Sequence, residues 1–300
     1  MRTLVTGGAG FLGAALVRAL RDAGDDVIAF DLAPVDGVRG DLASWVDVTR
    51  AIEAARPDRI FHCGALLSAI AEADVPRAVR TNADGTFNVL EAARLMGVRQ
   101  VVFTSTVATY GEGAGDPVSE GAAQRPATIY GVTKVYGERL GEYYASRYGL
   151  DFRGVRLPSV VGPGRGATGV SAYSSLMIEE PARGRPYTVP LEQRSAMPIL
   201  YLDDGVRALL DLSAAARPPR HVYNIAGISP TAAEIADAVR AAIPAAQIDF
   251  DPDAASQVVL DSWPVAIDDS SARAEWGWTH DRDLQGLVDT FVTAARKEAP

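Results

Sequence analysis

The sequence predicts an α/β protein, in which a doubly wound parallel sheet is joined to a smaller C-terminal region. Three observations support this fold class. Predicted strands and helices alternate from residue 1 to about residue 157, a glycine-rich turn separates the first strand from the first helix, and Asp31 ends the second strand. Regular alternation of this kind favours a parallel sheet, because each crossover between neighbouring parallel strands passes through a helix.

The composition is that of an ordinary soluble globular protein, with 300 residues, of which 48% are hydrophobic and 22% charged. A formal net charge of −9 argues against nucleic-acid partners, which bind a basic face. No run of about 18 apolar residues occurs, so we expect no membrane span. The three histidines are scattered without metal-ligand spacing, so we expect no metal site.

The N-terminus and the cysteine content indicate the compartment. The chain runs from Met1 and Arg2 directly into a strand, which predicts that no signal peptide is present. The single cysteine, Cys63, excludes an intramolecular disulfide and suits a reducing environment. We therefore expect a cytoplasmic protein.

The first strand, residues 2–6, ends in a glycine-rich turn that opens a helix. In such a turn Gly7 permits the sharp reversal, Gly10 lets a pyrophosphate approach the backbone, and Gly13 lets the helix pack closely on the strand. The helix N-terminus adds N–H donors and positive potential. At this strand-to-helix junction the spacing predicts a Rossmann-type dinucleotide site.

Acidic residues follow the next two strands. The strand at residues 27–30 ends at Asp31, whose carboxylate would accept hydrogen bonds from the adenosine ribose and repel a 2′-phosphate, which favours NAD over NADP. The alternative is an unrelated surface carboxylate. Asp41 and Leu42 end a third short strand and could flank an adenine, whereas the alternative is a helix N-cap at Asp41 or Ser44.

The fourth predicted strand, residues 59–62, leads into a turn of small residues at 63–69. Ligands gather at the carboxyl ends of strands in open α/β sheets. We expect Ser68 to contact a substrate, because it is a polar group in an apolar loop. His62 and Cys63 are expected to be packing residues.

A long helix is predicted over about 74–96, followed by a strand at 100–103. That strand runs into a hydroxyl-rich segment at 104–111, which again lies at the ligand edge of the sheet. Residues 112–126 are polar and rich in glycine and proline, and this composition predicts a loop.

The helix that starts at Thr128 carries Tyr130 and Lys134. Residues four apart lie on one face of a helix, one turn from each other. An ammonium close to a phenol favours the phenolate and would lower a pKa of about 10, giving a general base. The alternative for such a pair is a solvated helix face.

The second half of the chain is less regular, with a strand at 152–157 and a glycine-rich loop at 162–166. Further helices and extended pieces are predicted at 173–183, 187–190, 203–216, 221–225, 231–243 and 283–297. We expect Trp263, Trp276 and Trp278 to fill the core of the smaller region or a subunit contact.

These elements suggest two functional parts. A dinucleotide-binding domain would comprise residues 1–160 together with about 200–227, because the strand at 221–225 is expected to return to the main sheet. The remaining segments, about 161–199 and 228–300, would form the substrate-binding region.

The combination of TGGAGFLG at 6–13, Asp31, STVATYG at 105–111 and YGVTK at 130–134 resembles the extended short-chain dehydrogenase/reductase superfamily, also known as the NAD-dependent epimerase/dehydratase family. The resemblance covers nearly the whole chain. It implies NAD as cofactor and a catalytic group of Thr106, Tyr130 and Lys134, in which Lys134 binds the nicotinamide ribose and lowers the pKa of Tyr130. The expected cofactor contacts are Gly7, Gly10, Phe11, Leu12, Gly13, Asp31, Asp41, Leu42, Cys63, Gly64, Ala65, Asn82, Tyr130, Lys134 and Leu157. The expected substrate contacts are Ser68, Thr106, Val107, Tyr130 and Ser171.

Four longer stretches, at 62–69, 130–153, 197–204 and 261–278, look like the short-chain L-threonine 3-dehydrogenases. The last is the most specific, because its length and unusual composition make a chance likeness poor. The resemblance implies NAD-dependent oxidation of a secondary alcohol beside an amino acid centre, giving 2-amino-3-oxobutanoate. It also implies a homodimer that forms through helices.

The chain departs from that subgroup in its substrate loop, where Ser171 and Ala172 stand in place of an adjacent Thr and Asp. A carboxylate is the natural partner of a substrate ammonium, and losing one charge-assisted bond costs about 1.5–3 kcal/mol. One hypothesis is that Glu179 or Glu180 replaces it. The other is that the substrate lacks an amine and is a hydroxy acid or sugar acid bound through Arg165 or Arg194.

Two other functions compete with a dehydrogenase. A nucleotide-sugar epimerase or dehydratase would use the same three catalytic residues to make a transient keto sugar and would release no net NADH. A non-catalytic NAD-binding protein commonly lacks the tyrosine or the lysine, whereas this chain has both Tyr130 and Lys134.

Overall fold

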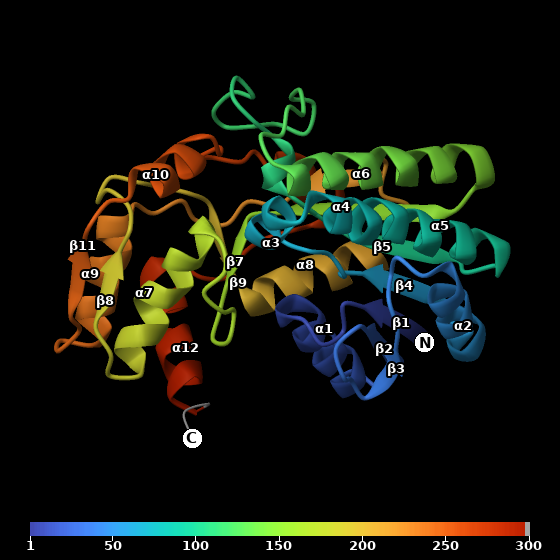
Figure 1. Cartoon of the computed structure of the whole chain (residues 1–300), viewed down its shortest axis with the longest axis horizontal. Helices are drawn as coiled ribbons and strands as arrows, with labels where there is room; N and C mark the ends of the chain where they lie inside the picture. Colours follow the sequence, from blue (N-terminus) through green and yellow to red (C-terminus); the bar gives the residue numbers. More distant parts are fainter. Residues whose placement is uncertain (298–300) are drawn as a thin grey trace.

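A computed structural model describes residues 1–297 and contains a seven-stranded parallel sheet in the order β10-β6-β5-β4-β1-β2-β3 (Figure 1). The order reverses between β1 and β4, which is where open sheets of this kind bind ligands. The predicted fold class is confirmed. The strands are β1 (Arg2–Thr6), β2 (Asp26–Asp31), β3 (Gly37–Arg39), β4 (Arg59–His62), β5 (Gln100–Thr106), β6 (Asp151–Leu157) and β10 (Val222–Asn224).

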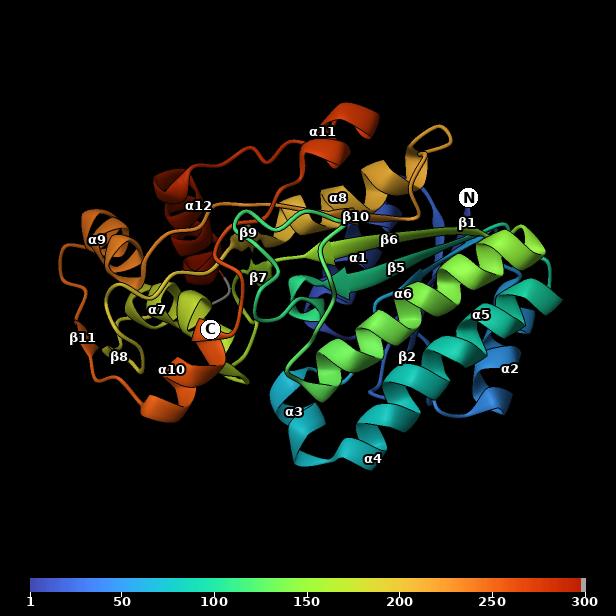
Figure 2. The same ribbon diagram turned by 90° about the horizontal axis from the view of Figure 1, so that it is seen from above.

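Helices cover both faces of the sheet (Figures 1 and 2). One face carries α2 (Trp45–Ala55), α5 (Gly85–Leu95) and α6 (Ile129–Tyr148), which lie side by side. The other face carries α1 (Phe11–Asp22) and α8 (Leu202–Ala214). Because both faces are covered, the central strands β1, β4, β5, β6 and β10 are buried nearly throughout, whereas the edge strand β3 is largely exposed.

The register of the strands brings the predicted site residues to one edge. Thr6 pairs with His62 across β1 and β4, and Thr106 pairs with Leu157 across β5 and β6. All of these residues end their strands, so the segments that follow meet at the carboxyl edge.

The helix predicted over about 74–96 is present as a continuous helical run over residues 75–95, although its middle is π-helical, which the sequence did not predict. The structure has α3 (Ser68–Ala73), α4 (Val75–Ala78), a π-helical segment at Val79–Asp84, and then α5. The wide π turn contains Asn82, whose side-chain amide accepts a hydrogen bond from the backbone N–H of Leu66 and donates one to the carbonyl oxygen of Leu66. A hydrophobic pattern cannot distinguish this turn from α-helix, because the apolar spacing barely changes.

The C-terminal region has its own hydrophobic cluster, built around Met177, Ile199, Ile235 and Phe291. Two small parallel sheets, β7 with β9 and β8 with β11, flank it. Its elements are β7 (Ser159–Val161), α7 (Tyr173–Ala182), β8 (Tyr187–Val189), β9 (Ile199–Tyr201), α9 (Ala232–Ala242), β11 (Ile248–Phe250), α10 (Ala254–Asp261) and α12 (Leu284–Lys297), with a 3₁₀ turn at Val170–Ala172. Helix α11 (Ser270–Trp276) packs instead against β10 of the main sheet. No helix among residues 1–297 is long and apolar enough to span a membrane.

The three tryptophans do not share one core, contrary to the prediction. Trp278 is buried in the cluster beneath the main sheet, where its Nε1–H donates to Asp269, and Trp276 packs against the same cluster. Trp263 packs against the C-terminal cluster instead. These tryptophans lie in or next to irregular segments, where no helix or strand periodicity indicates which way a side chain points.

Candidate active site

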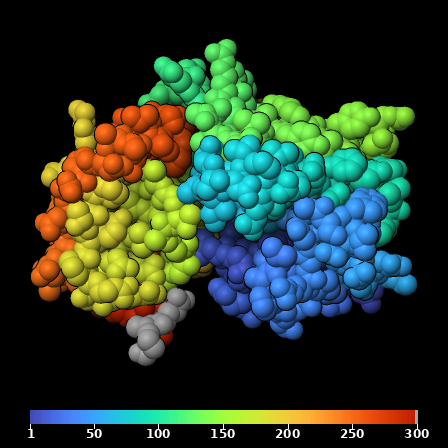
Figure 3. All heavy atoms as spheres, in the orientation of Figure 1, coloured from blue at the N-terminus to red at the C-terminus, as the bar shows by residue number. Residues whose placement is uncertain are grey.

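A cavity of about 1010 Å³ opens at the carboxyl edge of the sheet. Residues from both the main sheet and the C-terminal region line it. In Figure 3 the surface is hollowed between the yellow-green segment and the blue and cyan segments. A volume of this size is at the upper end of the range for small-molecule sites, which is consistent with a cofactor and a substrate bound together.

The glycine turn forms one end of the cavity and leaves no room for side chains. A Cβ on Gly13 would lie 2.0 Å from the carbonyl oxygen of Gly7, and a Cβ on Gly7 would lie 2.6 Å from the backbone nitrogen of Gly64. Gly7 also has φ +71°, a conformation that favours glycine. Helix α1 begins directly after Gly10 with no side-chain cap, so its first N–H groups face the cavity end.

Gly13→Ala is expected to abolish measurable NAD binding, because the new methyl group forces helix α1 away from the turn. Gly121→Ala is the matched control, since a Cβ there meets no atom within 4 Å. Isothermal titration with NAD should detect binding by the control and none by the Gly13 variant. Equal affinities would show that the turn does not hold the dinucleotide.

Asp31 lies beside the glycine turn, where its carboxylate accepts hydrogen bonds from the backbone N–H groups of Ala9 (3.0 Å) and Ala33 (2.9 Å). These bonds fix the carboxylate at the cavity wall and leave lone pairs for ribose hydroxyls. Asp41 also lines the cavity, and the N-cap of α2 is Ser44. Asp41 is therefore not the helix cap.

Thr106 and Tyr130 meet within the cavity wall. The Thr106 side chain lies close enough to Tyr130 to lower the pKa of its hydroxyl, and the Thr106 hydroxyl accepts a hydrogen bond from the backbone N–H of Ala108 (3.1 Å). Thr106 ends β5, and Tyr130 lies in the first turn of α6, whose N-cap is Thr128. A substrate hydroxyl placed between the two oxygens could bond both.

Lys134 lies one turn along α6 and is 3% exposed. Its Nζ donates to the carbonyl oxygen of Thr104 at 2.7 Å and lies 4.6 Å from the ring centroid of Phe103. The distance from Nζ to the ring centroid of Tyr130 is 5.7 Å. The ammonium is therefore fixed beside the tyrosine and is bonded to the end of β5.

The pKa values differ from the expectation that Lys134 lowers the pKa of Tyr130. Burial raises the pKa of Tyr130 to about 12, and the opposing influences are the Thr106 side chain and the charge of Arg165. Burial also lowers the pKa of Lys134 to about 8, because its ammonium is desolvated. The charge of Arg165 therefore favours the phenolate form of Tyr130.

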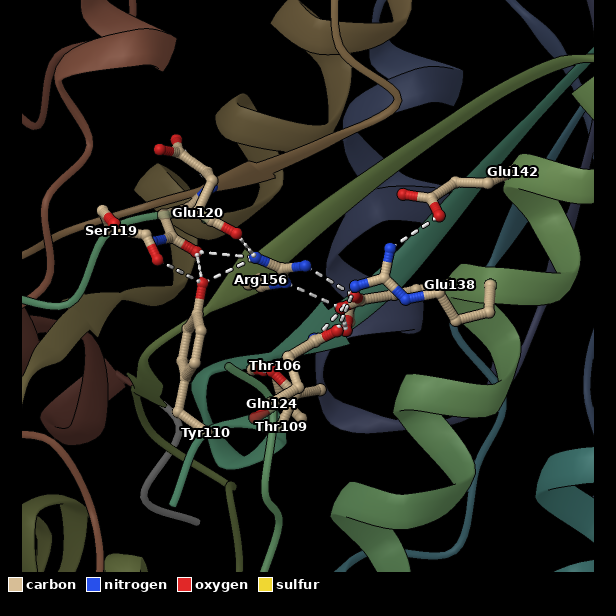
Figure 4. Close-up of polar contacts among 12 residues, drawn as sticks. Thr106, Thr109, Tyr110, Ser119, Glu120, Gln124, Glu138, Glu142 and Arg156 are labelled. Carbon is tan, nitrogen blue, oxygen red and sulfur yellow. Dashed lines mark hydrogen bonds and ion pairs between the residues drawn. The ribbon is translucent and has the colours of Figure 1, made fainter. Parts of the chain in front are cut away.

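A buried polar network fixes the helix that carries these residues (Figure 4). Glu138, one turn beyond Lys134, is fully buried and forms a bidentate pair with Arg156 at 2.9 and 2.7 Å. Ser105 donates to the same carboxylate, and Tyr110 accepts from Arg156 at 2.6 Å. The network joins α6 to β5 and β6, so it fixes Tyr130 relative to Thr106.

His62 and Cys63 are chemically unreactive packing residues, as predicted. The His62 ring bonds Thr6 (2.7 Å) and Thr86 (3.0 Å), and burial lowers its pKa to about 3, so it is neutral. Burial raises the pKa of the Cys63 thiol to about 12, which makes it unreactive. Cys63 nevertheless lines the cavity.

Asn82 does not line the cavity, unlike every other predicted cofactor or substrate contact. It is buried, bonds the backbone of Leu66 and donates to Thr133 at 3.2 Å. Asn82 therefore joins the loop after β4 to α6. We assign it a positioning role in place of the expected cofactor contact.

The substrate end of the cavity contains residues that the sequence did not single out as contacts. Ser171 lines it as predicted, whereas Ala172 is buried and does not. Trp263 contributes to the wall together with Met197 and Pro198. The sequence could have indicated Trp263 as a contact, because the Trp-Pro pair lies within the stretch at 261–278 that resembles the L-threonine 3-dehydrogenases.

Comparison with known proteins gives a consistent set of relatives. Residues 3–226 match the model of the NAD dependent epimerase/dehydratase family. The mitochondrial L-threonine 3-dehydrogenase of Sus scrofa is 37% identical, over 97% of this chain and 82% of the relative. The crystal structure of an L-threonine dehydrogenase from Phytophthora infestans is 35% identical with a TM-score of 0.93, covering 98% of this chain and 99% of the other. A UDP-glucose 4-epimerase from Thermotoga maritima is 26% identical with a TM-score of 0.89, covering 99% of each chain.

Proposed function

Because the chain belongs to the NAD-dependent epimerase/dehydratase family and is an oxidoreductase acting on CH–OH groups, we propose that it oxidises a small secondary alcohol to a ketone with NAD. The observation that carries the proposal is the meeting of Thr106, Tyr130 and Lys134 in a cavity that also contains the glycine turn. The model reaction is that of the L-threonine dehydrogenases, conversion of L-threonine to 2-amino-3-oxobutanoate. A related hydroxy acid or sugar acid is the other candidate class.

The residues that would hold NAD are those of the turn, the strand ends and α6. We assign the pyrophosphate to Gly7, Gly10 and Gly13, and the adenosine ribose to Asp31. When bound, NAD supplies the hydride acceptor for the substrate carbon. We assign cofactor binding to residues 1–160 and about 200–227, and substrate binding to about 161–199 and 228–300. The further contacts proposed for the cofactor are Phe11, Leu12, Asp41, Leu42, Cys63, Gly64, Ala65, Tyr130, Lys134 and Leu157.

The chain's own residues account for the proton chemistry. Thr106 holds the substrate hydroxyl, and Tyr130 takes its proton as the general base. Lys134 is fixed by its hydrogen bond to Thr104, so its ammonium stays beside the Tyr130 phenolate that acts as the base. Ser68, Val107 and Ser171 complete the proposed substrate contacts.

The test is a panel of L-threonine, simple 3-hydroxy acids and sugar acids, incubated with the full chain and NAD and scored by the appearance of NADH. Sustained NADH formation from at least one member is the expected result. A protein that binds NAD but oxidises no member of the panel would contradict the proposal.

A nucleotide-sugar epimerase is the second candidate, favoured by the likeness to the UDP-glucose 4-epimerase of Thermotoga maritima. Such an enzyme re-reduces its intermediate, so NADH would not accumulate. Interconversion of a nucleotide sugar without net NADH formation would favour this candidate over the dehydrogenase.

We also propose a homodimer through α5 and α6. These adjacent helices expose five large apolar side chains, which are Phe87, Leu95, Val132, Tyr136 and Tyr143. Such a group of exposed apolar residues is typical of a protein–protein contact, whereas single exposed apolar residues are common on any surface. Light scattering should give about twice the chain mass of 31.7 kDa, and Tyr136→Glu should give one chain mass. A monomeric unmodified chain would contradict this proposal.

A cytoplasmic location is the last part of the proposal. The one cysteine, Cys63, leaves the fold without an intramolecular disulfide, and burial raises the pKa of its thiol, so it resists oxidation. Cell fractionation should recover the protein with cytoplasmic markers.

A further inference from the structure

We infer that the substrate of the proposed dehydrogenase reaction is a small hydroxy acid whose carboxylate pairs with Arg165 and which carries no ammonium group. The inference rests on the proposed function and narrows it to one class of alcohol. The observations behind it are the cationic character of the substrate end and the arrangement of the nearby carboxylates.

Arg165 is a half-buried cation in the wall of the substrate end. Its Nη2 donates to the Ser171 hydroxyl at 2.6 Å, and its Nε donates to the carbonyl oxygen of Val160 at 3.2 Å. A guanidinium has five N–H donors, so these two bonds leave three for a ligand. Among residues 1–297 the structure shows no ion pair for it, and a partly desolvated cation without a counter-ion favours an anionic ligand.

The guanidinium is also close enough to the reacting group to orient a small acid. Arg165 is one of the groups that lower the pKa of Tyr130, and both side chains line the same cavity. A planar carboxylate can bond a guanidinium in a bidentate manner. An acid held on Arg165 could therefore present a nearby hydroxyl to Thr106 and Tyr130.

Glu179 and Glu180, which could have replaced the aspartate that this chain lacks, are both paired with other groups. Glu179 accepts from the backbone N–H of Gly164 at 3.2 Å and pairs with Arg183 at 2.6 Å. Glu180 forms a bidentate pair with Arg185. Neither glutamate lines the cavity, so the structure excludes both as the contact expected for a substrate ammonium.

Arg194, the other candidate for a carboxylate partner, is excluded in the same way. Its side chain is 86% exposed, pairs with Glu192 and does not line the cavity. Of the two arginines that the sequence left open, only Arg165 lies where a substrate could meet it.

Three carboxylates do line the cavity. Asp31 and Asp41 belong to the strand ends beside the glycine turn, where we assign the adenosine. Glu72 on α3 is exposed, and its Oε1 accepts from the backbone N–H of Ile129 at 2.7 Å, at the start of α6. An exposed, solvated carboxylate that already caps a helix is a weak partner for an ammonium.

The rest of the substrate end suits neutral groups. Met197, Pro198 and Trp263 supply an apolar wall, and Ser68 and Thr168 supply hydroxyls. A substrate methyl or hydroxyl group would therefore be accommodated, whereas an ammonium would lose its hydration without gaining a buried counter-ion.

The reaction balances with the residues and cofactor already proposed. The O–H and C–H bonds of the carbinol break, and a C=O bond forms. The proton passes to the Tyr130 phenolate and then to solvent. The carbinol carbon is oxidised as its hydride reduces NAD⁺ to NADH.

The test compares substrates that differ in one group, with the full chain and saturating NAD. These are L-threonine, 2,3-dihydroxybutanoate with a hydroxyl in place of the amine, 3-hydroxybutanoate with neither, and 1-amino-2-propanol without the carboxylate. An amine-free acid is expected to exceed L-threonine in kcat/KM by roughly 10–100-fold, and 1-amino-2-propanol should be the poorest. L-threonine as the best substrate would overturn the inference while leaving the dehydrogenase function intact. No oxidation of any alcohol would overturn both.

Arg165→Met assigns the effect to one residue. It should raise KM for the best acid by roughly 10–100-fold, and calorimetry should show the same loss when the acid is titrated into protein saturated with NADH. The rise of kcat with pH should also move to higher pH, because the variant lacks a charge that lowers the pKa of Tyr130. Arg194→Met is the matched control and should leave KM unchanged. An unchanged KM in the Arg165 variant would overturn the inference. A protein that oxidises L-threonine and loses this activity in the Glu72→Gln variant would also overturn it, because Glu72 would then bind the substrate ammonium.

Discussion

Tyr130→Phe is expected to lower kcat by roughly 10²–10⁴-fold while NAD binding stays nearly unchanged. The variant removes one oxygen, which lies beside the Thr106 side chain and which we assign as the acceptor of the substrate proton. The ring remains to pack near Lys134, whose own bond to Thr104 does not involve the tyrosine. The residues that we assign to NAD binding should therefore keep their positions.

Initial rates at saturating substrate and calorimetric titration with NAD measure the two effects separately. Tyr136→Phe is the matched control, because it removes a hydroxyl from the same helix at a 42% exposed position outside the cavity. A Tyr130 variant that turns over at the normal rate would refute the assignment of the general base. A parallel loss of NAD binding would instead indicate a structural role.

Glu138→Gln is expected to lower the free energy of unfolding by about 3–5 kcal/mol, because it leaves the Arg156 cation buried and unpaired. Both side chains are almost fully buried, with exposures of 3% and 0% for the arginine and the glutamate. The amide that replaces one carboxylate oxygen would also place N–H groups opposite donors of Arg156, Ser105 or Gln124. The expected loss is therefore large for a change of one atom.

Glu142→Gln is the matched control, one turn further along α6 (Figure 4). Its ion pair with Arg139 is exposed, with exposures of 31% for the glutamate and 58% for the arginine, so the loss should be only about 0–1 kcal/mol. Urea unfolding of the two variants gives the comparison directly. Equal losses would show that the buried pair does not stabilise the fold. The double variant Glu138→Leu with Arg156→Met should recover part of the stability, because no unpaired charge remains.

The sheet and the cofactor end of the site could be predicted from the sequence, because they depend on local signals. Gly7, Gly10 and Gly13 lie at a fixed spacing, and Asp31 directly follows a strand. The carboxyl ends of parallel strands meet at one edge whatever the details of packing. For this reason the predicted residues of the first half line one cavity, with Asn82 as the exception.

The substrate end could not be predicted in the same way, because it is built from irregular segments. Arg165 lies in a loop between Gly164 and Gly166, both of which have a positive φ, so no periodic pattern indicates the direction of its side chain. Whether Glu179 or Glu180 could reach a ligand depended on their arginine partners, which the sequence alone does not pair. Likewise, the Lys134 bond to Thr104 required the packing of α6 on β5.

Counting NADH formed per chain tests most directly whether the cavity performs net oxidation. The protein should be incubated with excess NAD and the best amine-free hydroxy acid, and NADH should be followed until the reaction stops. We expect many equivalents of NADH per chain, together with an equal amount of ketone. At most one equivalent per chain, retained by the protein, would contradict a dehydrogenase and indicate a transient redox step of the epimerase kind.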